Sequence, residues 1–342
     1  MQQISNDTLQ SKVISFLRFP LIVGVILIHT QLSNANEEFV CYENTKFIIS
    51  NVIARIAVPL FFVCSGFLFF FKTEEFSFHT YLSKLKKRVK TLLIPYLIWN
   101  TLFIVAFNII SGGFVIGEGF DWKDWLRVFG GNCFHHPSNY PLWFIGDLMW
   151  VILFTPIIYW LTKRLRIFFP LILGVLWLIN SNICWKTEAF FFFCLGAFFS
   201  INKKCFTDLV KSHTLVLGFI YLLFVIATFC AKDYAFWIYL RRLSVVIGMG
   251  FVVSLVTKFI ANGKWKENKF LTTSSFFLYL HHAILLPLHK KVLITIIPPT
   301  CDANMIILYF LWAILTIIIG LGLYYIIKRL LPKTTSFLMG GR

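Results

Sequence analysis

The feature that most constrains the fold is a series of ten long apolar stretches, which fill most of the 342 residues. A helix needs roughly 20 mostly apolar residues to cross the hydrocarbon core of a bilayer. Hydrophobic residues make up 58% of the chain and charged residues 14%, whereas a soluble domain has about 45–50% and about 25%. This composition excludes a soluble enzyme, a disordered chain and a nucleic-acid-binding domain. We expect membrane spans near residues 13–32, 47–71, 90–110, 142–162, 167–182, 186–201, 214–231, 235–260, 270–297 and 304–330.

These stretches predict an all-α fold. We expect a single integral-membrane domain over residues 1–342, built as a polytopic bundle of about ten transmembrane helices. The sequence shows no internal repeat and no soluble appendage. The fifth and sixth stretches are short, and together they also resemble one re-entrant pair.

The distribution of charge indicates how the bundle is oriented. The net charge is +17, and cytoplasmic loops of membrane proteins are enriched in Lys and Arg. We take the N-terminus, the loops after the even-numbered stretches and the C-terminus as cytoplasmic. These segments then hold 21 of the 32 Lys and Arg, and the opposite loops hold seven. Both termini are therefore expected in the cytoplasm, and the densest basic patch, Lys84 to Lys90, is expected in a cytoplasmic loop.

Several ionisable residues lie inside the apolar stretches. Placing such a group in hydrocarbon costs at least about 2.5–3.5 kcal/mol, so they face a bundle interior or a wet cavity. The alternative is that long side chains near span ends reach the interface. That alternative suits His29 poorly, because this residue follows an almost unbroken apolar run. The intramembrane residues are Arg18, Arg55, Asp147, Arg241, Arg242, His29, His281, His282 and His289.

Two of these residues share one helix face in the first stretch. Arg18 and His29 are eleven residues apart, which at 100° per residue is within about 20° of three full turns, and they are about 16 Å apart along the axis. Pro20 lies between them and favours a kink.

In the ninth stretch, Ser275, Tyr279 and His282 also share a face. They either form hydrogen bonds between helices or carry protons near a sugar hydroxyl.

Read in order, five segments resemble acyltransferase family 3, the bacterial integral-membrane O-acyltransferases. They include an Arg and a His with ten residues between them, a Val-Pro-Leu-Phe-Phe-Val-x-Ser-Gly phrase with an Arg upstream, and a basic stretch before Ile-Pro-Tyr. A Leu-Trp-Phe element and a Tyr-Leu-x-His element follow. The matching segments are Arg18 to His29, Val58 to Gly66 with Arg55, Lys84 to Tyr96, Leu142 to Ile145, and Tyr279 to His282.

The chain departs from the family pattern at two places. Thr91 stands where the family often has a second arginine after Arg88. Asp147 follows Gly146 where many members carry an arginine, so it either pairs with an intramembrane arginine or indicates a different acceptor. Many relatives also carry an extracytoplasmic esterase-like domain. This chain ends at Arg342, so we expect any such activity from a separate partner.

The resemblance implies transfer of an acyl group, usually acetyl, from cytoplasmic acetyl-CoA to a hydroxyl of a cell-surface glycan or lipid-linked sugar, in the bacterial cytoplasmic membrane. Acyl-CoA is then a donor, and no bound cofactor or metal is expected. The basic inner face would attract this anionic donor, although topology alone also accounts for the basic patch. No Ser-His-Asp or nucleophilic Cys constellation is evident, which favours direct transfer.

We expect His29 to be the general base and Arg18 to clamp a phosphate or order the pantetheine arm. Ser65 is either a nucleophile or, more simply, a small residue that permits close helix packing. Tyr279 and His282 are expected to orient the acceptor or to act as a second proton carrier. The complete set of expected substrate-binding residues is Arg55, Ser65, Arg88, Trp143, Asp147, Arg241, Arg242, Tyr279 and His282.

Two other classes of protein fit the apolar composition. One is a transporter or flippase for a glycolipid or polysaccharide precursor, which would usually show an inverted repeat. The other is a sensor or binding domain on the same membrane fold. The family motifs favour the enzyme over both.

Overall fold

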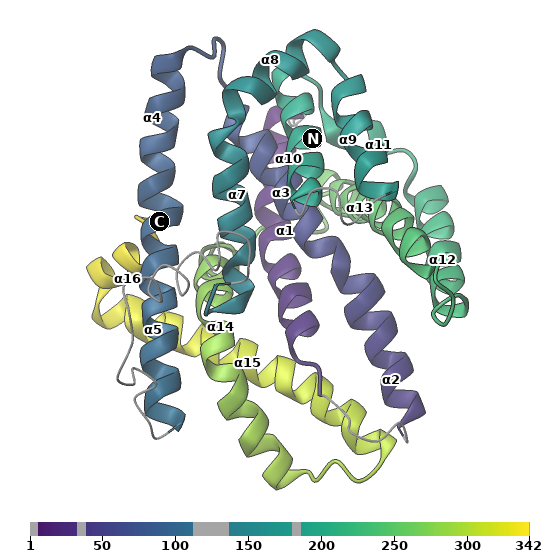
Figure 1. Ribbon diagram of the computed structural model, residues 1–342, viewed down its shortest axis with the longest axis vertical. Coiled ribbons are helices and arrows are strands. Elements are labelled where there is room, and N and C mark those ends of the chain that lie inside the picture. The colour runs from purple at the N-terminus through teal and green to yellow at the C-terminus, as the bar shows by residue number, and fades with distance from the viewer. Residues whose placement is uncertain (1–5, 33–38, 112–136, 180–185, 342) are drawn as a thin grey trace.

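The computed structural model describes residues 6–32, 39–111, 137–179 and 186–341. Within these ranges the chain is helical and contains no β-strand, which confirms the all-α prediction (Figure 1). The Cys133 to His136 stretch, the one place where a Cys and two His cluster in sequence, lies outside the described residues.

Six helical segments among the described residues are long and apolar enough to cross a membrane. A seventh crossing is formed by α7 (Trp143–Leu153) and α8 (Thr155–Leu165) if this pair, bent by 66°, is one span. Three shorter apolar helices also coincide with predicted stretches: α9 (Phe168–Ile179), α10 (Thr187–Ile201) and α12 (Thr214–Cys230). The count of ten crossings and the side of each terminus therefore stay predictions. The six long segments are Asp7–His29, Val40–Phe70, Phe78–Ala106, Trp237–Ala261, Lys269–Ile296 and Asp302–Leu330.

The second segment is longer than its apolar run predicts and changes its winding part of the way along. It passes through α2 (Val40–Lys46), the π-helical η1 (Phe47–Ile53), the 3-10 turn η2 (Ala54–Ile56) and α3 (Ala57–Phe70). Departures of this kind inside helices are frequent at functional sites. Arg55 lies in η2, where the winding changes.

The basic stretch after α3 is helical, which corrects its expected place in a loop. Helix α4 (Phe78–Arg88) runs through η3 (Val89–Leu93) into α5 (Ile94–Ser111) and forms one column at the edge of the molecule (Figure 1). The Ser77 hydroxyl accepts a hydrogen bond from the Thr80 amide at 3.2 Å and caps α4. A capped, amphipathic start lets the helix begin well before the apolar run does.

Helices α3 and α10 cross with their backbones in contact. A Cβ atom on Gly66 would lie 2.0 Å from the Phe193 carbonyl oxygen, and one on Gly196 would lie 2.0 Å from that of Val63. Only glycine fits at either position. The close packing that the sequence assigned to Ser65 therefore belongs to its neighbour Gly66.

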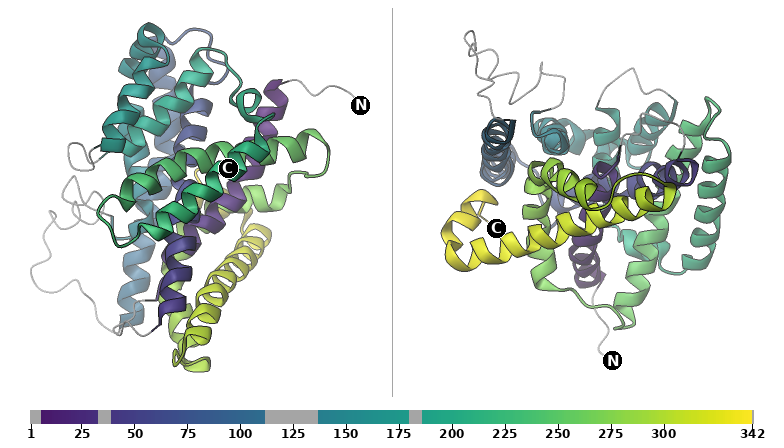
Figure 2. Two further views of the ribbon diagram at one scale, coloured as in Figure 1. Left: turned by 90° about the vertical axis from the view of Figure 1, so that its right-hand side faces the viewer. Right: turned by 90° about the horizontal axis from the view of Figure 1, so that it is seen from below.

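Helix α1 (Asn6–His29) runs through the middle of the bundle and packs against α3, α13 (Trp237–Ala261) and α14 (Lys269–Ile296). Helix α12 pairs with α13, and α14 pairs with α15 (Asp302–Leu330) (Figure 2). The chain then ends in the short α16 (Pro332–Leu338), beside α5. The remaining short elements are η4 (Tyr140–Leu142) and α11 (Phe206–Val210).

Candidate active site

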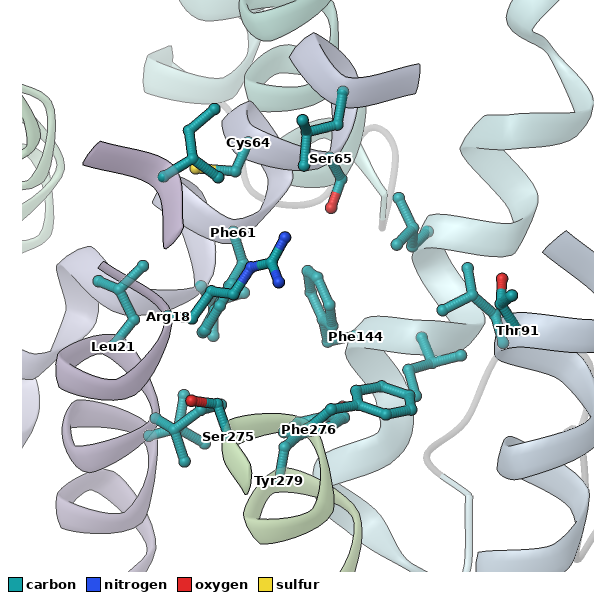
Figure 3. A pocket seen from close by; sticks show the side chains of 18 of the residues that line it. Arg18, Leu21, Phe61, Cys64, Ser65, Thr91, Phe144, Ser275, Phe276 and Tyr279 are labelled. Carbon is teal, nitrogen blue, oxygen red and sulfur yellow. The ribbon is translucent and has the colours of Figure 1, made fainter. Parts of the chain in front are cut away.

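A cavity of about 630 Å³ opens between α1, α3, α4, α7 and α14 (Figure 3). Its size is within the range of small-molecule sites. Arg18 and His29 both line it, which agrees with the single helix face that their spacing predicts. Six predicted site residues meet at this cavity, namely Arg18, His29, Ser65, Arg88, Trp143 and Tyr279.

The wall of the cavity is cationic. Four basic side chains line it, Arg18, Lys84, Lys87 and Arg88, and the described lining residues include no Asp or Glu. Among the described residues Arg18 has no hydrogen-bond or ion-pair partner, and its guanidinium points into the cavity (Figure 3). A charge that is left uncompensated in this way is available to an anionic ligand.

The other basic groups of the wall are held in place by α3. Lys84 Nζ donates to the Phe69 carbonyl and to Thr73 Oγ1, the second at 2.7 Å. The Arg88 guanidinium lies 5.8 Å from the centre of the Phe69 ring. Arg88 is one of the predicted substrate-binding residues, and Lys84 belongs to the basic patch Lys84 to Lys90 on the face that is expected to attract the donor.

His29 and His282 form a pair at the edge of the cavity. His282 is fully buried, and its Nε2 lies 3.4 Å from Nδ1 of His29. The Nδ1 atom of His282 lies 2.8 Å from the Tyr279 carbonyl, which can only accept, so this nitrogen carries the proton. In the neutral imidazole Nε2 of His282 is then an acceptor, which fits a proton on Nδ1 of His29. Nε2 of His29 is left unprotonated, which is the tautomer of a general base.

The rest of the predicted face on α14 serves to position the site. The Tyr279 hydroxyl donates to the Pro141 carbonyl at 2.6 Å and fixes η4 against α14. In consequence Tyr140 packs edge-on against His29, with 5.1 Å between ring centroids. The Ser275 hydroxyl lines the cavity and donates to the Leu271 carbonyl at 2.7 Å. His282 itself does not line the cavity, but it contacts His29, which does.

Arg55, Arg241 and Arg242 gather in a second place, which we call the arginine cluster, together with Glu188. All three guanidinium groups interact electrostatically with the Glu188 carboxylate. None of the three lines the cavity, although Arg55 is close enough to His29 to act on it electrostatically. Glu188 is not among the site residues predicted from the sequence. It lies inside the predicted span 186–201, and a carboxylate within a membrane span is itself a sign of a functional residue.

Asp147 lies on α7 and forms an ion pair with Lys186, which directly precedes α10. It is half-buried and does not line the cavity. The structure thus gives Asp147 a link between two helices, and Lys186 is a buried partner where the charge pattern placed a loop residue.

The fold and the site define a multi-pass membrane protein with an internal cationic cavity that ends at a histidine pair. The family model of acyltransferase 3, described as an acyltransferase domain, matches residues 12–329, and the chain belongs to this family. It is therefore a membrane acyltransferase.

A curated relative supports the same grouping over nearly the whole length. Across 350 aligned residues the chain is 25% identical to the succinoglycan biosynthesis protein ExoH of Rhizobium meliloti (strain 1021). The alignment covers 96% of this chain and 92% of that protein. No solved structure matches the chain significantly.

Proposed function

We propose that the protein transfers an acetyl group from cytoplasmic acetyl-CoA to a hydroxyl of a cell-surface glycan or lipid-linked sugar, in the bacterial cytoplasmic membrane. The observation that carries this proposal is that one cavity joins a cationic wall to the unprotonated nitrogen of a histidine pair. The relative named for succinoglycan biosynthesis supports a polysaccharide as the acceptor.

The cationic wall suits the donor. Coenzyme A carries several phosphate charges on a long arm that ends in the thioester. Arg18 and His29 are about 16 Å apart along α1, so phosphates held at the basic wall leave room for the arm to extend towards His29. Arginine binds phosphate through two parallel hydrogen bonds, which suits the unpaired guanidinium of Arg18.

The transfer step uses His29 as the base. Nε2 of His29 takes the proton of the acceptor hydroxyl while the oxygen attacks the thioester carbonyl, so that a C–O bond forms. The C–S bond then breaks, and the thiolate of coenzyme A receives the proton back from the imidazolium. A well-placed base of this kind accelerates the reaction typically 10²–10⁴-fold. His282 acts as a positioning residue, because its Nε2 holds Nδ1–H of His29 and keeps the base in the active tautomer.

The test uses inside-out membrane vesicles that contain the full chain. Radiolabelled acetyl-CoA is added outside, and the label is followed into the glycan fraction. We expect the wild type to consume the donor and label the glycan, and a His29→Ala variant present at the same level to do neither. A transporter or a sensor would leave acetyl-CoA intact, and that result would refute the proposal.

A further inference from the structure

The arginine cluster contains more positive charge than its one carboxylate compensates. Arg55 comes from η2, Arg241 and Arg242 from α13, and Glu188 from α10, so four side chains from three elements converge. Three guanidinium groups against one carboxylate leave two positive charges. Keeping such an excess within membrane-spanning segments is costly unless a ligand offsets it.

The three arginines are not equally engaged. Arg242 is 8% exposed, donates to the Leu178 carbonyl at 2.9 Å and lies over the Trp177 ring, so its role is to join α13 to α9. Arg55 has only a 3.5 Å contact with Asn51, and its Nε is buried without a hydrogen-bond partner among the described residues.

Arg241 is half-buried and lies over the Trp237 ring, 4.9 Å from its centre. No hydrogen-bond partner of Arg241 occurs in the part of the chain that the structure describes. Among the described residues, Arg55 and Arg241 are therefore the two cations of the cluster that form no hydrogen bond to another helix. Glu188 interacts with both of them electrostatically, but among the described residues its carboxylate accepts a hydrogen bond from Trp177 Nε1, at 3.4 Å, and forms none with either guanidinium group.

The aromatic residues around the start of α13 indicate the depth of the cluster. Tyr234, Phe236 and Tyr239 are 61%, 52% and 44% exposed. Tyrosine and tryptophan are enriched at the level of the lipid headgroups, so Tyr234 and Tyr239 indicate that level. Arg241 follows Tyr239 by two residues, which places it just inside that level, where the phosphates of membrane lipids lie.

We propose that Arg55 and Arg241 bind the phosphate group of a lipid-linked sugar, so that the acceptor is a membrane-anchored phosphosugar rather than a released polysaccharide. The proposal rests on the proposed function for the role of the bound sugar. The planar guanidinium group of an arginine can donate two parallel hydrogen bonds to a phosphate group, and two such arginines can hold one phosphate from two sides. Because η2, which carries Arg55, packs against α1, which carries His29, a phosphate held here places the attached sugar beside the helix of the base.

A binding experiment on the purified full-length protein in nanodiscs tests the site directly. The probes are a long-chain polyprenyl diphosphate and the uncharged polyprenol of the same length. We expect the wild type to bind the diphosphate at least tenfold more tightly, and Arg55→Gln and Arg241→Gln each to lose about tenfold of that preference. Arg164→Gln, an exposed arginine over Trp160 on α8, should keep the preference.

Three results would overturn the proposal. These are equal binding of the two probes by the wild type, an unchanged preference in both glutamine variants, and equally tight binding of phosphatidylglycerol, which would make this a general lipid site. Arg241→Lys retains the charge and should retain part of the preference, which separates loss of binding from loss of folding.

The same variants distinguish this proposal from the proposed function. In the vesicle assay Arg241→Gln should raise KM for the lipid-linked acceptor about tenfold and leave KM for acetyl-CoA unchanged, whereas a merely structural role would impair both. Preferential diphosphate binding by a wild type that transfers no label would refute the transferase function and leave the binding site intact.

Discussion

The cavity and the arginine cluster hold similar numbers of cations, but they differ in whether a carboxylate and aromatic rings surround those cations. In the cavity, Arg18 faces open space, and the described lining residues supply no carboxylate. In the cluster, Glu188 sits among three guanidinium groups, and aromatic rings cover Arg241 and Arg242. Both lie in membrane-spanning segments, where an isolated charge has a high free-energy cost.

The difference concerns what each charge does when no ligand is bound. Arg18 contributes little to folding, because among the described residues it has no hydrogen-bond or ion-pair partner to lose. In the cluster, Arg242 donates to the Leu178 carbonyl and so joins α13 to α9, and the Glu188 carboxylate offsets part of the positive charge, so that its removal leaves more of that charge uncompensated. Substitutions in the cavity should therefore change catalysis with little change in stability, and substitutions in the cluster should change stability as well.

The largest effect is expected at His29, which lines the cavity and also lies within electrostatic reach of Arg55. His29→Ala removes the group that takes the acceptor proton, so kcat should fall about 10²–10⁴-fold. Steady-state transfer of label from acetyl-CoA measures this. His79→Ala on the exposed face of α4 is the matched control and should transfer normally. A His29→Ala variant with normal turnover would remove this residue from the mechanism.

Arg18→Gln tests the cavity on its own. The lost charge-assisted hydrogen bonds are worth about 1.5–3 kcal/mol, so kcat/KM for acetyl-CoA should fall roughly 10–150-fold. The thermal midpoint should stay within a degree or two, since Arg18 has no partner among the described residues. An unchanged kcat/KM would contradict the assignment of the cavity to the donor. A large loss of stability would contradict the contrast between the two regions.

The sequence predicted the fold well where a helix is defined by its own apolar run. All ten predicted stretches coincide with apolar helical segments, because burial of a long apolar run in a bilayer is a local property. It was wrong about Lys84 to Lys90, because charge suggested a loop where the capped helix α4 continues. The 66° bend after Leu153 was not predicted either, since it depends on how α7 and α8 pack.

The same distinction holds for the site: features within one helix could be predicted from the sequence, and contacts between helices could not. Arg18 and His29 share a face through helix periodicity alone, so their common cavity could be predicted. The contact of His29 with His282, which is 253 positions away, depends on the packing of α1 against α14 and could not be read from either segment. Glu188 lies inside the predicted span 186–201, but the sequence alone does not show which residues it meets. The packing of α10 against its neighbours brings it to the arginines.

Glu188→Gln tests the cluster as a stabilising element. Removal of the carboxylate leaves three guanidinium groups that repel one another, at a cost of about 2 kcal/mol once partial exposure is taken into account. That cost corresponds to a fall in Tm of roughly 3 °C for a chain of this size. Thermal unfolding in nanodiscs measures it. Glu43→Gln, which breaks a surface pair with Lys46, should leave Tm nearly unchanged. Equal shifts in the two variants would contradict the structural role of Glu188.

The smallest expected effect is at Lys87, which lines the cavity and is exposed on α4. Lys87→Gln should raise KM for acetyl-CoA only about two- to fourfold at low ionic strength, because an exposed charge contributes less than about 1 kcal/mol. The difference from the wild type should disappear near 0.5 M salt, where the Debye length is only about 4 Å and an exposed charge is largely screened. Arg18→Gln should keep most of its defect at the same salt concentration, since its guanidinium acts at contact distance inside the cavity. If both defects vanish together, Arg18 attracts the donor from a distance and does not hold it.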